Sequence, residues 1–441
     1  MKKSNIAKLI LVVTLSFGLM TQLFATGGYF RHGYGIKYGA LAGAGTALSL
    51  SSFGAASNPA GLAFIGTRYD VNFAYFSPSR KFTVTGNPSG FPGTFGLAPG
   101  VTESESNGFP MPSLGANWMI NDNMAIGAAL FGNGGMNTDY PKPIFGDPNS
   151  PDAGVNLEQM FFGLTYSIKL GENHALGITG LFAWQRFAAK GLGMFGAMGM
   201  SSDPANLSGN RHSVSTGVGV RIGYQGRLLP NLAIGASYQI KTSMSAFDEY
   251  KGLFAEHGKF DIPSTWNVGI AFDATKNFTI ALDVQQILYG GVKSIANPID
   301  PKALPPAFPD GQGGFIPNPN HVPLGADNGS GFGWDDIFIY KIGLLYRVND
   351  WTVMAGYSYG DNPVKESEVL FNILAPAVIQ QHITFGITKK INKSNELSLA
   401  FMYAPSNSVS GANVFEAPNQ QTIEIEMSQF QVEVGYAFSV K

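Results

Sequence analysis

The chain contains no cysteine, little charge and, after residue 25, no apolar run long enough to cross a bilayer as a helix. The absence of Cys from 441 residues excludes disulfides and thiolate chemistry. Only 13% of the residues are charged, against roughly 25% in soluble domains. A net charge of −2 gives no reason to expect a nucleic-acid partner. The six His residues are scattered without metal-ligand spacing, so we expect no metal and no cofactor.

The first 25 residues have the layout of an export signal. Lys2 and Lys3 form a basic start, residues 6–19 an apolar run and residues 23–25 a cleavage site. We therefore expect residues 1–25 to be a secretory signal peptide. The alternative, an anchoring transmembrane helix, is disfavoured because the run is short and a Gly-rich stretch follows it.

Beyond residue 65, apolar side chains recur at every second position. Leu176, Ile178 and Phe182, for example, alternate with small or polar residues. This period is typical of transmembrane β-strands, which present every second side chain to lipid. Basic residues on the lipid face would cost about 2–4 kcal/mol each at mid-membrane. We therefore expect the charged residues of these strands to point into the lumen, whereas a soluble sandwich would bury them: Arg221, Asp283, Lys341 and Arg347.

Fourteen such segments are separated alternately by short turns and long loops. The predicted strands are 66–86, 108–120, 123–136, 156–170, 174–189, 211–227, 231–243, 259–273, 277–290, 335–348, 351–360, 378–391, 395–405 and 421–440. The six short turns are rich in Asn, Asp, Gly and Pro, which suit tight turns: 121–122, 171–173, 228–231, 274–277, 348–350 and 391–395. We predict an all-β, 14-stranded antiparallel transmembrane β-barrel over residues 66–441, in the bacterial outer membrane.

The last predicted strand changes the phase of its alternation. Ile423, Ile425 and Met427 are odd-numbered, whereas the apolar residues from Phe430 to Val440 are even-numbered. A β-bulge near residues 428–429 would produce this change.

Residues 26–65, between the signal peptide and the first strand, are too rich in Gly, Ala and Ser for a separate domain. Small side chains allow tight packing inside a lumen, and Pro and Asn fix a turn. We expect an N-terminal plug (hatch) whose turn is formed by Asn58, Pro59, Ala60 and Gly61. The alternative is a disordered linker.

A Gly/Ala-rich segment that ends in Asn58-Pro59-Ala60, followed by 14 strands, resembles the long-chain fatty-acid transporter (FadL) family of outer-membrane proteins. Trp334-Asp335-Asp336, Asn349-Asp350-Trp351 and Asp361-Asn362-Pro363-Val364 resemble that family's tenth and eleventh strands and the loop after them. The resemblance implies uptake of hydrophobic molecules, most simply long-chain fatty acids, by passive diffusion. It implies capture by outer loops, a lumenal pocket, plug movement and lateral release into the membrane through a kinked third strand.

The third predicted strand contains Gly132-Asn133-Gly134-Gly135, which interrupts its alternation. Glycines there permit a kink and remove side chains that would block an opening in the wall. The resemblance marks these residues as the lateral gate. The alternative is that they only make room for the plug.

Two loops are unusually apolar. One carries Met194, Phe195, Met198 and Met200, and Met adapts to varied ligand shapes. The other has Phe247, Tyr250, Leu253 and Phe254 at the spacing of one helix face. Together they are expected to form an entry groove, or to pack on each other over the barrel mouth, or both.

Fatty-acid transporters of this family hold the carboxylate with basic groups. Candidates are Arg186, Arg221 and Lys341, although Arg186 shares the phase of the lipid-facing Trp184. The basic position that the resemblance implies near the start of the tenth strand is occupied by Asp335. A neutral or aromatic hydrocarbon is therefore the alternative substrate.

Other classes of function are less favoured. A general porin would need an open lumen, and an outer-membrane lipid hydrolase would need a Ser or Asp with a His at the lipid-facing rim. Residues 356–360 fit the G-x-S-x-G pattern but continue an alternating strand. Residues 191–196 fit G-x-G-x-x-G without a βαβ context. We expect no enzyme, but a monomer whose partners are hydrophobic small molecules and membrane lipids.

Overall fold

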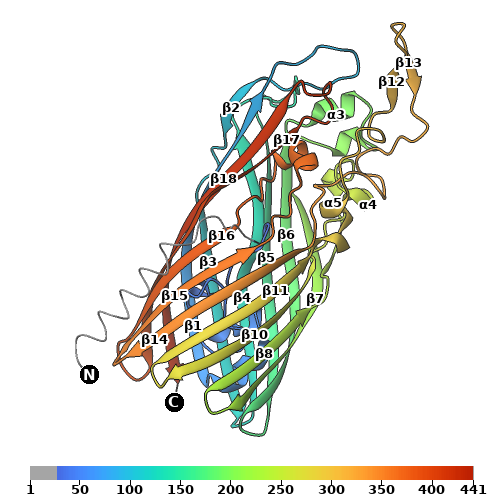
Figure 1. Ribbon diagram of the computed structural model, residues 1–441. Coiled ribbons are helices and arrows are strands. Elements are labelled where there is room, and N and C mark those ends of the chain that lie inside the picture. The colour runs from blue at the N-terminus through green and yellow to red at the C-terminus, as the bar shows by residue number, and fades with distance from the viewer. Residues whose placement is uncertain (1–26, 441) are drawn as a thin grey trace, which may run out of the picture.

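The computed structural model describes residues 27–440. Fourteen antiparallel strands form one sheet that closes where β18 pairs with β1, from Thr67↔Val440 to Thr85↔Thr422 (Figure 1). The barrel strands are β1 (Thr67–Thr85), β3 (Phe109–Asn121), β4 (Met124–Tyr140), β5 (Ala153–Leu170), β6 (His174–Lys190), β7 (Ser213–Leu229), β8 (Leu232–Gln239), β10 (Ser264–Thr275), β11 (Phe278–Leu288), β14 (Ile337–Val348), β15 (Trp351–Gly360), β16 (Gln381–Lys390), β17 (Asn395–Ala412) and β18 (Thr422–Val440). The predicted strand count is confirmed.

Smaller elements lie in the loops and the N-terminal residues. Short strands are β2 (Gly100–Glu103), β9 (Ser243–Met244), β12 (Ala307–Pro309) and β13 (Phe315–Pro317). Helical turns are α2 (Ile36–Gly39), η1 (Ser52–Ala56), η2 (Pro59–Phe64), α3 (Gly193–Ala197), η3 (Pro204–Asn206), η4 (Asp248–Tyr250), α4 (Ala255–Gly258), η5 (Tyr289–Gly291), α5 (Lys293–Ala296), η6 (Glu366–Glu368) and α6 (Val369–Asn372). Among the described residues, no helix is both long enough and apolar enough to span a bilayer.

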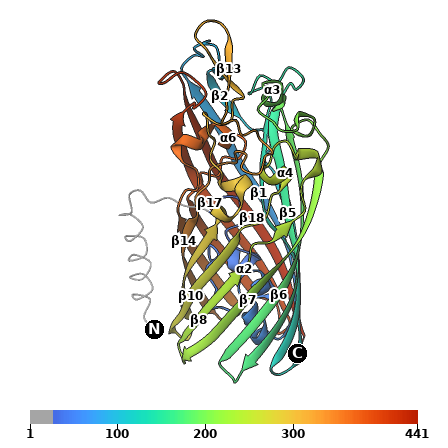
Figure 2. The same cartoon turned by 90° about the vertical axis from the view of Figure 1, so that its right-hand side faces the viewer.

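The connections divide the barrel into two ends. Six turns of two to four residues lie at the end where β18 finishes, which we call the short-turn end. Seven longer connections lie at the other, the loop end (Figures 1 and 2). The six predicted short turns fall on the observed ones, because Asn, Gly and Asp close antiparallel hairpins locally. Strand boundaries differ most at the loop end, where β17 continues to Ala412.

The alternation sorts side chains as expected. Leu176, Ile178 and Phe182 are 45–49% exposed on the outside of the barrel. The charged side chains of Arg221, Asp283 and Lys341 are buried on the inside. Arg347 follows the same inward phase near the short-turn end, where its guanidinium donates to Thr279 Oγ1 at 3.1 Å. The prediction of inward charges is confirmed.

The expected bulge in the last strand is wrong. β18 pairs with β1 without a register shift, so its odd-numbered residues face inward along the whole strand. Ile423 and Ile425 are fully buried among residues of the loop end. The sequence pattern changes because the barrel wall continues beyond the membrane there and encloses an apolar interior. The irregularity lies instead on β17, between Ala404 and Asn407.

The third barrel strand, β4, is irregular as predicted. Its register against β5 shifts between Gly132 and Gly134. Its pairing with β3 ends at Leu114↔Leu130, so residues 131–140 of β4 have no partner on β3. The bulge therefore lies beside a stretch of wall where two neighbouring strands part.

The N-terminal segment, residues 27–66, runs inside the barrel and contacts inward-facing side chains of the wall. Its Asn58 caps η2 by accepting from the Ala60 N–H at 3.2 Å, and donates to Thr46 O and Tyr224 O. Ser167 of β5 donates to Pro59 O at 2.6 Å. Gly177 permits this approach, because a Cβ there would overlap the Pro59 backbone. The predicted signal peptide, residues 1–25, lies outside the described residues.

Candidate functional site

A small cavity, with a volume of about 40 Å³, lies under the loops of the loop end. Aromatic and aliphatic side chains form most of its wall, and its only polar side chains are the hydroxyls of Ser294 and Ser330. The lining residues are Val155, Phe187, Leu192, Phe195, Leu253, Phe254, Ser294, Leu324, Ser330, Gly331, Phe332, Phe371 and Leu374. None of these carries a charge, so the cavity offers an apolar molecule contact without a cost in desolvated charge.

The two apolar loops meet at this cavity, but only part of each lines it. Phe195, Leu253 and Phe254 are in the wall. Met200 is buried in the same apolar core, and Met198 packs against it partly exposed; neither they nor Met194 line the cavity. The expected single helix over 247–254 is wrong: the segment contains only the turn η4, and α4 begins after it, at Ala255. Phe247, Tyr250 and Phe254 nevertheless pack together around Phe187.

The sequence analysis missed the rest of the lining. Phe332, Phe371 and Leu374 come from the two loops that flank β14 and β15, and Val155 and Phe187 from the tops of β5 and β6. The sequence does offer one signal for Phe187. This large apolar residue continues the inward phase of β6 at the end of the strand, where the loops begin. Nothing in the local pattern of the loops indicates which of them converge.

An aromatic cluster continues from Phe332 of the cavity wall to the N-terminal segment. Trp334 is fully buried, lies 6.0 Å from Phe332 between ring centroids and donates from Nε1 to Asn372 Oδ1 at 2.6 Å. Its ring lies 5.9 Å from Tyr29 and 5.1 Å from Tyr289. The predicted Trp-Asp-Asp motif thus places its Trp against the N-terminal segment.

Tyr29 and Phe30 connect this cluster to the gap in the wall. Phe30 forms a β-bridge with Gly134, and the Arg31 N–H donates to Asn133 O at 3.0 Å. A Cβ at Gly134 would overlap the Tyr29 carbonyl, so this glycine does accommodate the N-terminal segment. The same residues stand at the unpaired edge of β4. The structure therefore shows that the glycine run accommodates the N-terminal segment, whereas its role as a lateral gate stays a prediction.

A ladder of neutral polar groups runs along the inner wall over β4, β5 and β6. Tyr34 donates to Asn133 Oδ1 at 2.7 Å, Asn133 donates to Gln159 at 3.0 Å, and Gln159 donates to Gln185 at 2.9 Å. Gln185 then donates to Phe260 O at 2.8 Å. Each buried amide is thereby paired without any ion.

Charged groups hold the N-terminal segment nearer the short-turn end. Arg31 donates to Glu433 at 2.7 Å between side chains that are 6% and 1% exposed. The Asp283 carboxylate accepts three hydrogen bonds from the Gly45–Thr46 turn: from both backbone N–H groups, at 2.9 and 2.8 Å, and from the Thr46 hydroxyl at 2.7 Å. Hydrogen bonds to an ionised acceptor are among the stronger ones in proteins.

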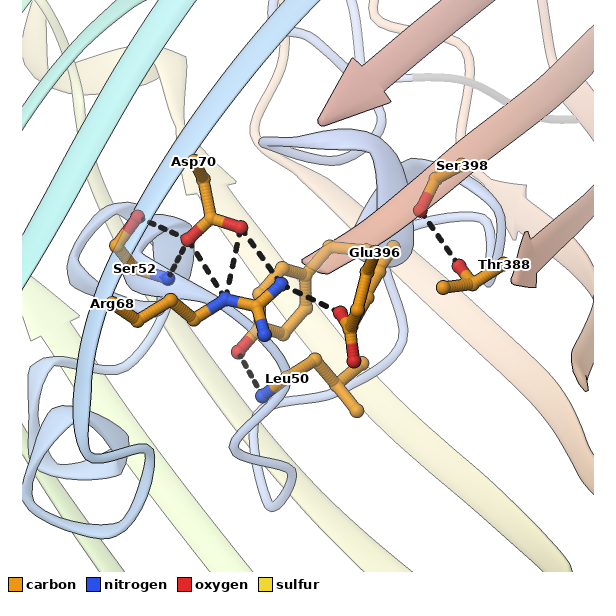
Figure 3. Close-up of polar contacts among 9 residues, drawn as sticks. Leu50, Ser52, Arg68, Asp70, Thr388, Glu396 and Ser398 are labelled. Carbon is orange, nitrogen blue, oxygen red and sulfur yellow. Dashed lines mark hydrogen bonds and ion pairs between the residues drawn. The ribbon is translucent and has the colours of Figure 1, made fainter. Parts of the chain in front are cut away.

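A second carboxylate holds η1 in the same way. Figure 3 shows Asp70 of β1 between Ser52 and Arg68. Its Oδ2 accepts from the Ser52 N–H at 2.9 Å and from the hydroxyl at 2.6 Å, while Arg68 donates to Oδ1 at 2.9 Å. Arg68 also donates to Glu396 at 2.9 Å, and Lys37 donates to the same carboxylate at 2.6 Å. This network, the Asp70 network, joins α2 and η1 to the wall.

The imidazole rings of His32 and His382 pack together inside the barrel, near the charged groups of Arg31 and Lys341. The rings of His32 and His382 are 4.7 Å apart, and His382 lies 3.2 Å from the Ser358 hydroxyl. Burial, together with the charges of Arg31 and Lys341, lowers the pKa of His32 to about 3. The His32 ring is therefore neutral at physiological pH. Ser358 belongs to the G-x-S-x-G pattern, which lies within β15 with no helix directly after it and lacks the strand–turn–helix context of a nucleophile elbow.

None of the three carboxylate candidates reaches the cavity. Arg186 is a correction: it lies on the outside of the wall, between the buried Gln185 and Phe187, in a bidentate pair with Glu158 at 2.7 and 3.0 Å. Arg221 is buried inside, donating to Ser57 O at 3.1 Å. Lys341 lies 3.4 Å from His32 O. Both inward cations thus contact the N-terminal segment.

Comparison with known proteins agrees with this architecture. A family described as outer membrane protein transport protein (OMPP1/FadL/TodX) matches residues 31–438. The chain belongs to the OMPP1/FadL/TodX family. It is an outer-membrane β-barrel of a family that transports hydrophobic compounds, and the predicted family and location are confirmed. No curated protein matches the chain.

Solved structures show the same fold as this OMPP1/FadL/TodX member. The P. putida toluene transporter TodX has a TM-score of 0.65 at 19% identity, over 93% of this chain and 99% of that chain. The Ralstonia pickettii toluene transporter TbuX has 0.60 at 17%, over 93% and 99%. A Pseudomonas aeruginosa FadL homologue has 0.64 at 14%, over 94% and 100%. The loop end of the barrel therefore faces the cell exterior and the short-turn end the periplasm.

Proposed function

We propose that this protein admits neutral hydrophobic molecules, such as monoaromatic hydrocarbons, through the outer membrane by passive diffusion. The observation that carries the proposal is the apolar cavity, whose lining includes no basic side chain to meet a carboxylate. A fatty acid would bring its charge into a site that has only two hydroxyls to solvate it. TodX and TbuX, which share this fold, are toluene transporters, and this agrees with the choice.

The N-terminal segment is proposed as the plug that closes the route. Tyr29 and Phe30 lie between the aromatic floor of the cavity and the unpaired edge of β4. A shift of these two residues would join the cavity to the gap between β3 and β4 and let an apolar solute leave sideways into the membrane. The polar ladder and charged clamps below favour this lateral path, because an apolar solute would meet buried polar groups on a straight path.

Competitive binding tests the substrate class. A neutral fluorescent aromatic probe bound to the detergent-purified protein is displaced with toluene or with hexadecanoate. We expect toluene to displace the probe, Phe254→Ser to weaken that displacement, and Lys341→Ala to leave it unchanged. Val101→Ser, at an exposed site away from the cavity, is the matched control.

The opposite pattern identifies a fatty-acid transporter. Displacement by hexadecanoate but not by toluene, weakened by Lys341→Ala or Arg221→Ala, would overturn the neutral-substrate proposal. The family assignment would stand in either case.

A further inference from the structure

One element of the loop end takes no part in the cavity or the barrel. β12 and β13 form a two-stranded hairpin that pairs only with itself, with Phe308 opposite Ile316. Both views show it projecting past the other loops, away from the short-turn end (Figures 1 and 2). Isolated two-stranded hairpins are only marginally stable in water. A hairpin in such an exposed position therefore calls for an explanation.

The tip of this hairpin is held by its own backbone. The Asp310 carboxylate accepts from the Gln312 N–H at 2.7 Å and from the Gly314 N–H at 2.8 Å, and the Asp310 N–H donates to Gly314 O at 3.0 Å. Gly311 and Gly313 supply the positive φ values that the turn requires. Asp310 is the only acidic or basic side chain from residue 303 to 320, and its charge is directed at these N–H groups.

The base of the hairpin is closed by hydrogen bonds within its own loop, which continues to the cavity. Asn318 donates from Nδ2 to Lys302 O and to Pro305 O, both at 2.8 Å, and the Val322 N–H donates to Ala303 O at 2.8 Å. Two residues further on, Leu324 lines the cavity. The hairpin is therefore a braced arm that continues directly into the cavity wall.

The surface of this arm is apolar. Phe315 and Ile316 are 62% and 60% exposed, and Phe308 is 39% exposed. The neighbouring loop adds Phe91, which is 64% exposed. This loop lies next to the hairpin, because its Gly93 packs against Pro309. Single exposed apolar residues are ordinary, but several gathered on one projecting element mark an interaction surface.

The chemistry of this surface suits a fluid apolar phase better than a protein. Specific protein interfaces carry a polar rim and about one hydrogen bond per 100–200 Å². The arm presents rings and an aliphatic side chain, and its one carboxylate is already paired within the turn. Side chains of this kind insert into lipid or oil surfaces without needing a shaped partner.

We propose that the hairpin 307–317 docks the protein onto the surface of hydrocarbon droplets and delivers their molecules to the cavity. This inference rests on the proposed function, because docking to a droplet would supply the cavity with the same hydrocarbon substrate as a liquid. Hydrocarbon in excess of its solubility in water forms droplets, and an arm continuous with the cavity wall would bring the cavity to the droplet surface.

Flotation tests the docking. The full protein in lipid nanodiscs is mixed with hexadecane droplets, which are then floated by centrifugation. We expect the wild type to float with the droplets and the variant Phe308→Ser/Phe315→Ser/Ile316→Ser to do so at least about tenfold less. Val101→Ser, another exposed apolar residue at the loop end, should float like the wild type.

A second variant reports insertion directly. Phe315→Trp should give a blue-shifted difference spectrum on addition of droplets, relative to the wild type. Flotation equal in the wild type and the triple variant, or no spectral shift, would overturn the proposal. So would association of nanodiscs with one another through the hairpin, since that indicates a second copy as the partner.

Uptake from two sources separates this inference from the proposed function. The triple variant should take up dissolved toluene like the wild type and lose uptake only from droplets. If the wild type fails to take up dissolved toluene, the proposed function fails. The flotation result still decides the docking surface in that case.

Discussion

The two ends of the lumen are built from opposite chemistry. At the loop end the interior is aromatic and aliphatic, and the cavity wall has no charge. Toward the short-turn end the interior is held by carboxylates and guanidinium groups, with Asp70, Asp283 and Glu433 all buried. The difference teaches that one barrel wall can serve two tasks. The apolar end can receive a solute, and the ionic end fastens the N-terminal segment.

The comparison also shows why the two ends cannot be exchanged. Apolar contacts are non-directional and tolerate solutes of varied shape. Charge-assisted hydrogen bonds fix one geometry and are costly to break when buried. A segment that must stay in place is thus held by ions, whereas a site that must fill and empty is lined by hydrocarbon.

Removal of residues 27–61 gives the largest expected effect. Without this segment the lumen of a 14-stranded barrel is open to water, so the ion conductance should rise from near zero to that of an open pore. Single-channel recording in planar bilayers measures it. High conductance in the intact protein would show that the segment does not close the lumen.

Breaking the Asp70 network comes next. Asp70→Ala leaves the Arg68 guanidinium without its buried partner and should lower the free energy of unfolding by about 3–5 kcal/mol. Urea unfolding in lipid vesicles measures the change.

The matched control for Asp70→Ala is an ion pair on the exposed part of the wall. Lys81 and Glu426 are 36% and 31% exposed at a distance of 3.0 Å. Lys81→Ala should cost no more than about 1 kcal/mol. Equal losses for the two variants would remove the distinction between the ionic interior and the ordinary surface.

Thr46→Val probes the Asp283 clamp without changing side-chain shape. The variant loses the hydroxyl bond to the carboxylate but keeps both backbone bonds. We expect a loss of about 1.5–3 kcal/mol in unfolding free energy, with a small rise in leak conductance. An unchanged stability would mean that the hydroxyl contributes nothing to the clamp.

Ile423→Val tests the apolar end and should have the smallest effect. Ile423 is fully buried on the inward face of β18, so removal of one methylene group should cost about 0.5–1.5 kcal/mol. The same unfolding assay measures it. Val434→Ala, on the lipid face, is the comparison, and a larger loss there would contradict the inward orientation of Ile423.

Much of the fold could be predicted from the sequence because its determinants are local. A period of two assigns each strand residue to one face, and Asn, Asp and Gly mark tight turns a few residues long. These two rules locate all 14 strands, the short-turn end and the inward positions of Arg221, Asp283 and Lys341. They also locate the bulge at Gly132–Gly134, since glycines interrupt the alternation there.

The tertiary structure decided most of the site, since only Phe195, Leu253 and Phe254 of the cavity lining could be named from the sequence. The cavity is formed where several loops and the tops of two strands converge, so its lining includes residues as far apart in the chain as Val155 and Leu374. Arg186 meets Glu158 outside the wall through strand register, and Ile423 turns inward because loops enclose it. Alternation fixes the face of a strand residue, but whether that face meets lipid, water or a folded loop depends on segments distant in the sequence.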